Sequence, residues 1–260
     1  MQTNKKKQTE MKHYELIHEY ASRLRLHHLD KELDSLINRA QENKYTYAEF
    51  LAAALEVDAH EKQGRDYGRR MAAAHLPARH SLELYDTDAV SGLTEKQLKE
   101  LRDLAWMRQA YNLIIQGGSG TGKTFLAAGL VADVIQQGGR GYLVTLTELM
   151  NCLRLKDSVE KAGRMYRRLL TADILAIDDI MLCSLTKEDT MLLFSLVNEL
   201  TGKTSIIITS QRLLTDWAKR LEDEVLAAAI LDRLLERSEV IQLIGNSWRL
   251  ENRQTFFQEP

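Results

Sequence analysis

The stretch that decides the fold is Gly117-Gly118-Ser119-Gly120-Thr121-Gly122-Lys123-Thr124. A short apolar run precedes it and a helical apolar segment that begins at Phe125 follows it. Strand, glycine-rich turn and helix in this order form a P-loop, whose backbone N–H groups and helix N-terminus face phosphate oxygens. We therefore predict that these eight residues and Phe125 bind ATP, with Lys123 reaching the β- and γ-phosphates and Thr124 ligating Mg²⁺. The alternative, a glycine-rich turn with a chance lysine, leaves the flanking strand and helix unexplained.

Two acids follow another apolar run, Leu175-Ala176-Ile177-Asp178-Asp179. A P-loop needs a carboxylate partner for its metal ion, and a strand end downstream is where such folds supply it. We expect Asp178 to hold Mg²⁺, largely through water, and Asp179 to polarise the attacking water as a general base. The alternative is a strand that ends in two solvated acids.

A further polar strand end is Thr209-Ser210-Gln211. Parallel sheets present functional side chains at their carboxyl edge. Gln211, in preference to Ser210, is predicted to sense the γ-phosphate or to orient water. An ordinary polar strand end is the alternative.

The rest of the chain indicates an α/β protein with a parallel sheet of about five strands between helices, because short apolar runs alternate with helical patterns. The predicted strands are residues 112–116, 141–146, 174–177, 205–209 and 240–244. Residues before about 75 read as helices, one of which begins at a capping box of Thr46 and Glu49. We predict a helical N-terminal domain over 1–75, a linker over 76–92 and the ATPase domain over 93–260.

Composition sets the broad class. The 260 residues are 44% hydrophobic and 28% charged, with a net charge of −2, which is typical of a globular protein. We expect a cytoplasmic protein without membrane contact, since no apolar run approaches the ~18 residues that span a bilayer and no secretory signal opens the chain. Cys152 and Cys183 are expected to be reduced thiols.

Several motifs together resemble the IstB/DnaC branch of AAA+ ATPases. They are the P-loop, Asp178-Asp179, Thr209-Ser210-Gln211, Ala229-Ile230-Leu231-Asp232-Arg233-Leu234 and Gly245-Asn246-Ser247-Trp248-Arg249. Tyr47-x-x-Phe50-Leu51, Arg69-Arg70, Leu82-Glu83 and Tyr85-Asp86 are similar to IstB proteins in particular, over roughly residues 40 to 250. The resemblance implies a helper ATPase of an insertion sequence that forms a homo-oligomer with ATP and works with a cognate transposase.

The resemblance also implies roles for two arginines. Arg233 is similar to an arginine finger that reaches the nucleotide of a neighbouring subunit, where a guanidinium stabilises a charge-dispersed transition state; a surface ion pair is its alternative. Arg249 resembles the family's C-terminal nucleotide sensor. The eleven residues after Arg249 are too few for a helical lid, so we expect an AAA+ core without a C-terminal lid domain. This chain has Asp178-Asp179 where many members have Asp-Glu, and Gln211 where many have Asn.

A basic stretch is the predicted DNA site. In related AAA+ initiators and loaders an extra helical element lies before the strand that ends in the metal-binding acid, which is the Asp178 strand here. Residues 147–171 lie at the corresponding position in this chain. Its predicted phosphate contacts are Arg154, Lys156, Lys161, Arg164, Arg167 and Arg168. Such contacts bind DNA without reading its sequence, so specificity would come from the partner; duplex DNA is the first candidate and the strand preference stays open. A solvated helix face is the alternative.

Three other functions stay open. A DnaC-type helicase loader shares the ATPase core and differs in its N-terminal partner domain. A P-loop small-molecule kinase would leave the Arg233 segment and the N-terminal helices without a role. An ATP-switched scaffold without turnover is compatible with the Asp178-Asp179 departure.

Overall fold

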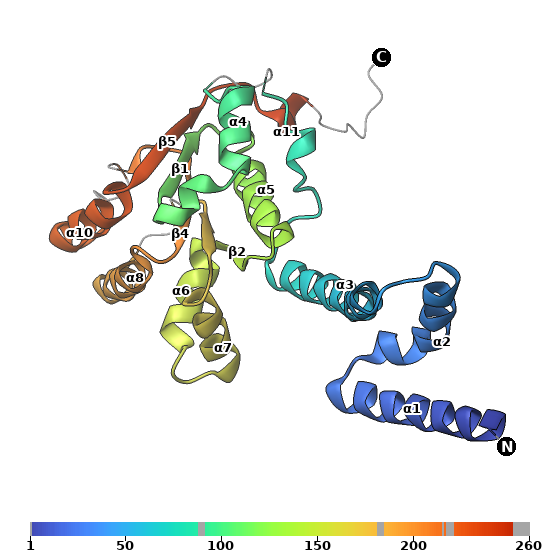
Figure 1. Cartoon of the computed structure of the whole chain (residues 1–260). Helices are drawn as coiled ribbons and strands as arrows, with labels where there is room; N and C mark the ends of the chain where they lie inside the picture. Colours follow the sequence, from blue (N-terminus) through green and yellow to red (C-terminus); the bar gives the residue numbers. More distant parts are fainter. Residues whose placement is uncertain (1, 88–91, 181–184, 215, 217–220, 252–260) are drawn as a thin grey trace, which may run out of the picture. The chain divides into compact units, whose positions relative to one another are not determined.

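The computed structural model describes residues 2–87, 92–180, 185–214, 216 and 221–251. The chain divides into two compact units, Met1–Arg69 and Arg70–Pro260, which are described separately (Figure 1). Cys183 lies outside the described residues, and Cys152 is a buried free thiol. Among the described residues no helix is both long enough and apolar enough to cross a membrane.

The first unit is helical. Its helices are α1 (Gln2–Leu24), α2 (His27–Glu42) and α3 (Tyr47–Ala73), the last of which continues into the second unit. The predicted capping box is present: Glu49 N–H donates to Thr46 Oγ1 (3.3 Å) and Thr46 N–H donates to the Glu49 carboxylate (2.7 Å). The N-terminus of α2 is capped from α3, because the Asp58 carboxylate accepts hydrogen bonds from the backbone N–H groups of His28 (3.2 Å) and Leu29 (2.9 Å).

The second unit is built on a five-stranded sheet in the order β2-β3-β4-β1-β5, in which every neighbouring pair is parallel. The strands are β1 (Asn112–Gly117), β2 (Gly141–Thr145), β3 (Ile174–Asp178), β4 (Ser205–Ser210) and β5 (Ser238–Leu243). This confirms the predicted α/β class and the parallel sheet. The carboxyl ends of β1, β3 and β4 lie side by side, which brings the P-loop, the acids and the polar end of β4 to one edge.

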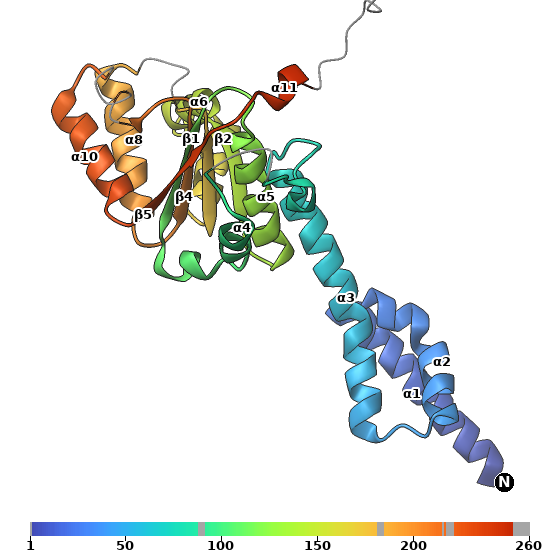
Figure 2. The same ribbon diagram turned by 90° about the horizontal axis from the view of Figure 1, so that it is seen from above.

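Helices cover both faces of this sheet (Figure 2). They are α4 (Glu95–Arg102), α5 (Lys123–Gln136), α6 (Leu146–Leu155), α7 (Glu160–Leu169), α8 (Lys187–Leu200), α10 (Glu224–Leu235) and α11 (Trp248–Glu251), with short 3₁₀ helices at Leu82–Leu84 (η1) and Ala105–Gln109 (η2). Helices α4 and α5 lie on one face, and α6, α8 and α10 lie on the other.

The core explains why the strands read as unbroken apolar runs. Leu113 and Ile115 of β1 pack into the cluster that contains α5, whereas Ile114 between them packs into the cluster of α6, α8 and α10. All three are fully buried, and burial of one such side chain contributes about 1.5–3 kcal/mol. A central strand covered on both sides therefore has no face open to solvent.

The strands begin and end within two residues of their predicted bounds, and two of these differences have local causes. Strand β2 ends at Thr145, one residue early, because Thr145 caps α6: its Oγ1 accepts from Glu148 N–H (3.2 Å) and its N–H donates to the Glu148 carboxylate (2.9 Å). Strand β5 begins at Ser238, two residues before the predicted start, because exposed residues such as Glu239 interrupt the apolar pattern of this edge strand.

Part of the segment predicted as a linker packs on the ATPase core. Leu82 in η1 is buried, and a Cβ added to Gly129 of α5 would lie 2.3 Å from Leu82 Cγ. Gly129 therefore gives η1 room to lie against α5. The boundaries at residues 75 and 92 stay predictions.

Candidate nucleotide-binding site

The P-loop joins the end of β1 to the start of α5 and has the backbone that its glycines allow. Gly120 (φ +82°) and Gly122 (φ +88°) lie in the left-handed region, which glycine adopts at little cost. The carbonyl oxygen of Gly118 accepts hydrogen bonds from Thr121 Oγ1 (2.9 Å) and Lys123 Nζ (2.7 Å). These bonds hold the loop in a curve at the N-terminus of α5, the geometry that binds phosphate.

Lys123 is buried at the centre of this curve. Burial lowers the pKa of its ammonium group, while Asp179 and Asp178 act in the opposite direction and Arg249 adds to the lowering. Burial makes the charged form of Lys123 costly. A nucleotide phosphate near the ammonium group would offset the cost of burying Lys123.

Thr124 and Asp178 face each other where the P-loop meets β3. Thr124 Oγ1 donates to the Asp178 carboxylate, at 2.9 Å from Oδ1 and 3.1 Å from Oδ2. A hydroxyl and a carboxylate are the hard oxygen ligands that Mg²⁺ prefers, and Mg²⁺ takes its remaining ligands from phosphates and water. Within the described part of the chain no cluster of three acidic, histidine or cysteine side chains offers a metal site independent of a nucleotide. The pair therefore fits a nucleotide-bound Mg²⁺ ion.

Asp179 lies next to this pair in an uncommon conformation. Its φ is +50°, a region that aspartate tolerates better than most residues. Gln211 Nε2 donates to Asp179 Oδ2 (3.1 Å), whereas Asp179 Oδ1 is buried and, among the described residues, has no hydrogen-bond partner. The structure thus brings Gln211 to Asp179, while the neighbouring Ser210 Oγ donates to the backbone oxygen of Arg212 (2.7 Å).

The segment after β5 lies against the P-loop. Trp248 N–H donates to Gly120 O (3.1 Å), and a Cβ added to Gly120 would lie 2.0 Å from Ser247 Oγ. Arg249, which follows, is exposed and close enough to influence the pKa of Lys123. The structure therefore places Arg249 at the predicted nucleotide site.

Tyr85 lies beside the P-loop, and the sequence indicated no chemical role for it. Its ring stacks on Phe125 (centroids 6.1 Å apart, planes at 23°), and a Cβ added to Gly122 would lie 3.4 Å from it. Its hydroxyl is buried without a hydrogen-bond partner in the described residues, and burial raises the pKa of Tyr85 to about 12. An aromatic pair of this kind is an apolar surface against which a flat ring of a ligand can lie. The only signal in the sequence was its place in the Tyr85-Asp86 motif.

Arg233 lies on α10 and is exposed to solvent. Within the described ranges its guanidinium makes no hydrogen bond or ion pair with this chain. The surface ion pair with Asp232 that would be the alternative role is not present there. Arg233 is therefore free to contact another molecule.

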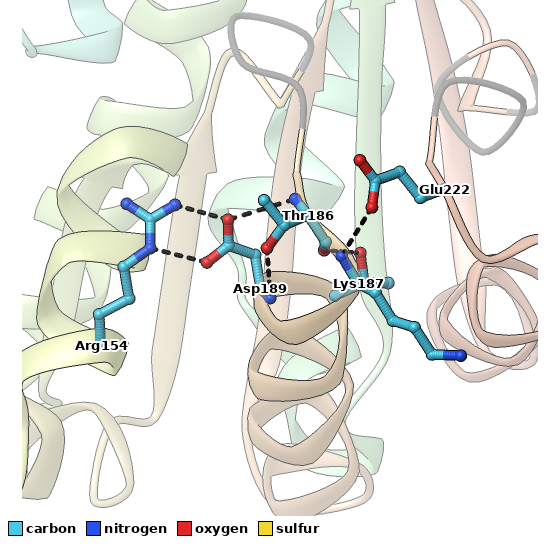
Figure 3. Close-up of polar contacts among 6 residues, drawn as sticks. Arg154, Thr186, Lys187, Asp189 and Glu222 are labelled. Carbon is cyan, nitrogen blue, oxygen red and sulfur yellow. Dashed lines mark hydrogen bonds and ion pairs between the residues drawn. The ribbon is translucent and has the colours of Figure 1, made fainter.

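The six basic residues predicted to contact DNA differ in the contacts that their side chains make. Arg154 is held by Asp189, a buried side chain at the start of α8, through bonds of 2.7 Å from Nε and 2.5 Å from its other nitrogen (Figure 3). The Arg154 guanidinium is the main cause of a pKa of Asp189 below the usual range. Lys156 Nζ lies 4.2 Å from the centre of the Tyr166 ring.

The other four basic residues are exposed on α7. Arg164 is paired with Glu160 one turn earlier. A cavity of about 590 Å³ between α6 and α7 has mostly apolar walls and is also lined by Lys161, Arg164 and Arg168. Lys161, Arg167 and Arg168 form no ion pair among the described residues.

The profile of the IstB-like ATP binding proteins matches residues 19–255. The chain belongs to this family. The predicted resemblance is thus confirmed, and the P-loop described above is that of an ATP-binding AAA+ protein.

Relatives of this IstB-like chain come from several bacterial insertion sequences. An IS21-like ATP-binding protein from Bacteroides fragilis is 44% identical over 95% of this chain and 94% of its own length. An IS21 ATP-binding protein from Pseudomonas aeruginosa is 34% identical over 90% and 88%, respectively. An IS5376 ATP-binding protein from Geobacillus stearothermophilus is 31% identical over 92% and 96%.

Solved structures with the same fold include DnaI, with a TM-score of 0.54 and 18% identity over 66% of the IstB-like chain and 94% of DnaI. AMPPCP-bound DnaA from Aquifex aeolicus has a TM-score of 0.51 and 18% identity over 65% of this chain and 50% of its own. At this identity the similarity shows the AAA+ fold alone.

Proposed function

We propose that this IstB-like chain hydrolyses ATP, assembles with ATP into a homo-oligomer and binds DNA to assist the transposase of an insertion sequence. The observation that carries the proposal is the convergence of Lys123, Thr124, Asp178 and Asp179 at one edge of the sheet. This set combines a cation for phosphates, two oxygen ligands for a metal ion and a second carboxylate beside them. These are the groups that enzymes use for phosphoryl transfer.

In this mechanism each residue has a separate task. The P-loop amides and Lys123 hold the phosphates, and Thr124 with Asp178 would hold Mg²⁺, which when bound neutralises charge on the β- and γ-phosphates. Asp179, steadied by Gln211, orients the attacking water and takes its proton. Asp179 Oδ1, which has no hydrogen-bond partner in the part of the chain that the structure describes, is the acceptor available for that proton.

The proposed assembly rests on the position of Arg233. Its guanidinium is exposed and engages no partner among the described residues of its own chain. We propose that it stabilises the transition state at the ATP site of a neighbouring copy. Each active site would then be shared, so hydrolysis would require the oligomer.

DNA binding and the transposase are supported by two observations. The similar proteins are ATP-binding proteins of insertion sequences, and exposed Lys161, Arg167 and Arg168 on α7 are free for phosphate contacts. Repetition of these charges through an oligomer would give a sequence-independent DNA site. The proposed location is cytoplasmic, where both DNA and transposase are found.

ATP turnover tests the catalytic part of the proposal. Asp179→Asn should retain Mg²⁺-dependent ATP binding and lose most phosphate release, whereas Asp178→Asn should weaken the Mg²⁺ dependence itself. A wild-type rate in Asp179→Asn would contradict the role of Asp179. Phosphate transferred to a metabolite instead of water would indicate a small-molecule kinase, and binding without turnover in the wild type would indicate a scaffold.

Mixing of two inactive variants tests the shared site. Arg233→Ala should bind ATP but not hydrolyse it, and Lys123→Ala should bind ATP about a hundredfold more weakly. Mixed oligomers would contain some sites with an intact P-loop and an intact Arg233, so activity should partly return. Mixed oligomers that stay inactive would argue against Arg233 acting in trans. Capture of a replicative helicase in place of the transposase would favour a helicase loader.

A further inference from the structure

Thr209, the penultimate residue of β4, connects the two acids of the site. Its side chain is 1% exposed. Its Oγ1 lies 2.6 Å from Asp178 Oδ1 and 2.8 Å from the backbone nitrogen of Asp179. No other side chain among the described residues bonds to both acids.

The direction of both hydrogen bonds is fixed by chemistry. The backbone N–H of Asp179 can only donate, so Thr209 Oγ1 accepts there. A hydroxyl has one proton, and the Thr209 proton therefore goes to Asp178 Oδ1, which at this distance is a charge-assisted acceptor. One side chain thus sets both the orientation of the Asp178 carboxylate and the backbone at Asp179.

This backbone needs support. Asp179 has a φ of +50°, which costs free energy for a residue other than glycine and persists only where surrounding contacts enforce it. The bond from Asp179 N–H to Thr209 Oγ1 and the bond from Ile180 N–H to Thr209 O (3.1 Å) enforce it from both sides. The turn directs Asp178 to Thr124 and Asp179 to Gln211.

Packing alone does not account for a threonine at this position. The preceding residues of β4, Ile206, Ile207 and Ile208, are buried β-branched side chains that fill the core. Valine would match the shape of threonine and would avoid burial of a hydroxyl group, which costs free energy unless the group is hydrogen-bonded. Among the described residues, the hydroxyl group of Thr209 bonds to the two acids alone.

We propose that Thr209 is a positioning residue that assigns the two acids their different tasks, Asp178 toward the nucleotide-bound metal ion and Asp179 toward the attacking water. The proposal deepens the proposed function, on whose site it rests. It predicts that the hydroxyl of Thr209, and not its methyl group, sets how strongly Mg²⁺ enhances ATP binding.

Three variants separate the hydroxyl from the shape. Thr209→Ser removes the methyl group and keeps the hydroxyl group, whereas Thr209→Ala removes both. Thr209→Val replaces the hydroxyl group by a methyl group at nearly constant volume. The affinity for a fluorescent ATP analogue is measured for each with excess EDTA and with excess Mg²⁺, beside the midpoint of urea unfolding. Because binding is measured, the result does not depend on whether the wild type hydrolyses ATP.

Thr209→Ser should keep the wild-type enhancement by Mg²⁺ within about twofold, whereas Thr209→Ala and Thr209→Val should lose about tenfold of it, the effect of one hydrogen bond to a charged group. Affinity in EDTA should stay unchanged in all three, since the P-loop is intact. Equal enhancement in Thr209→Ser and Thr209→Ala would overturn the proposal.

The wild type provides a test that no folding defect can obscure. Hydrogen exchange at the Asp179 amide should be slow without nucleotide, because Thr209 Oγ1 accepts from it. Exchange at the rate of an open loop would overturn the proposal even if the variants without the hydroxyl failed to fold.

Discussion

The P-loop edge of the sheet and the basic pair of helices α6 and α7 both carry charge, but their charges are held in opposite ways. At the sheet edge Lys123 is buried and contacts the loop, and Asp178 accepts from two threonines. On α7 the side chains of Arg167 and Arg168 are exposed and form no ion pair in the described residues. The first region is organised before a ligand arrives, whereas the second offers charge without fixed geometry. Such a difference suits recognition of one nucleotide on one side and sequence-independent contact with phosphates on the other.

The largest effect is expected where the charge is buried. Lys123→Ala should weaken ATP binding by about a hundredfold, since hydrogen bonds to charged groups contribute about 3 kcal/mol. A titration with a fluorescent ATP analogue measures this. Lys161→Ala, which removes an exposed lysine of α7, is the matched control and should leave the affinity unchanged. Similar affinities for both variants would remove the distinction between the two regions.

On α7 the effect should depend on salt. Neutralising Arg164, Arg167 and Arg168 together should weaken DNA binding about equally across unrelated sequences. The log–log salt slope on duplex DNA should fall by roughly 2.7 per chain, because each phosphate contact contributes roughly 0.9. A salt titration with and without ATP is the measurement. An unchanged slope with ATPase activity intact would place the DNA elsewhere.

Arg154 provides a test within helices α6 and α7 themselves, because its guanidinium is held by Asp189 although it is half-exposed. Arg154→Ala should lower the free energy of unfolding by about 1–2 kcal/mol at neutral pH, discounted for its half-exposed guanidinium. The pKa of Asp189 is lowered by Arg154. The contribution is therefore present above the unfolded-state pKa of about 3.9 and is lost as the pH falls through the lower folded-state pKa.

Urea unfolding at pH 7 and pH 3 checks this, and the gap between wild type and Arg154→Ala should narrow at pH 3. Arg168→Ala, at an exposed position on α7, should change stability by no more than about 0.5 kcal/mol. If Arg154→Ala lowered the free energy of DNA binding by more than it lowered the free energy of unfolding, Arg154 would belong to the DNA site.

The smallest effect concerns the helical N-terminal unit, where Asp58 caps α2 from α3. Asp58→Ala should cost about 1 kcal/mol, as the loss of other helix caps does, with Asp58→Asn intermediate because one amide oxygen can still accept. Urea unfolding followed by helix circular dichroism measures the change. Glu56→Ala, at an exposed position of α3, is the control. If Asp58→Ala and Glu56→Ala changed the free energy of unfolding equally, the buried polar contacts of this unit would not resemble those of the P-loop edge.

The sequence predicted those parts of the fold whose causes are local. Apolar runs gave the five strands, and Thr46 with Glu49 gave the start of a helix. The P-loop was equally readable because its chemistry depends on backbone freedom within eight consecutive residues. The two acids at the end of β3 were predicted because a P-loop needs a carboxylate at a downstream strand end.

What escaped prediction depends on contacts between distant segments. Thr209 meets Asp178 because β3 and β4 are neighbours in the sheet, an order that residue patterns do not specify. Arg154 lies 35 residues from Asp189, and a charge run indicates how many charges exist but not which are already paired. The position of Tyr85 beside the P-loop became visible only through its stacking on Phe125.

The contact between the P-loop and the segment after β5 has a kinetic consequence. Gly120 leaves no space between its backbone and Ser247, and its carbonyl oxygen accepts from Trp248 N–H. A change in loop curvature must therefore move this segment and disturb the end of β5, the strand that follows α10 and Arg233. If Arg233 acts at the site of a neighbouring copy as proposed, release of a bound nucleotide would be coupled to the surface that carries Arg233. The residence time of the nucleotide should accordingly lengthen when that surface is occupied, so that the lifetime of an assembly and the lifetime of its bound nucleotide rise together.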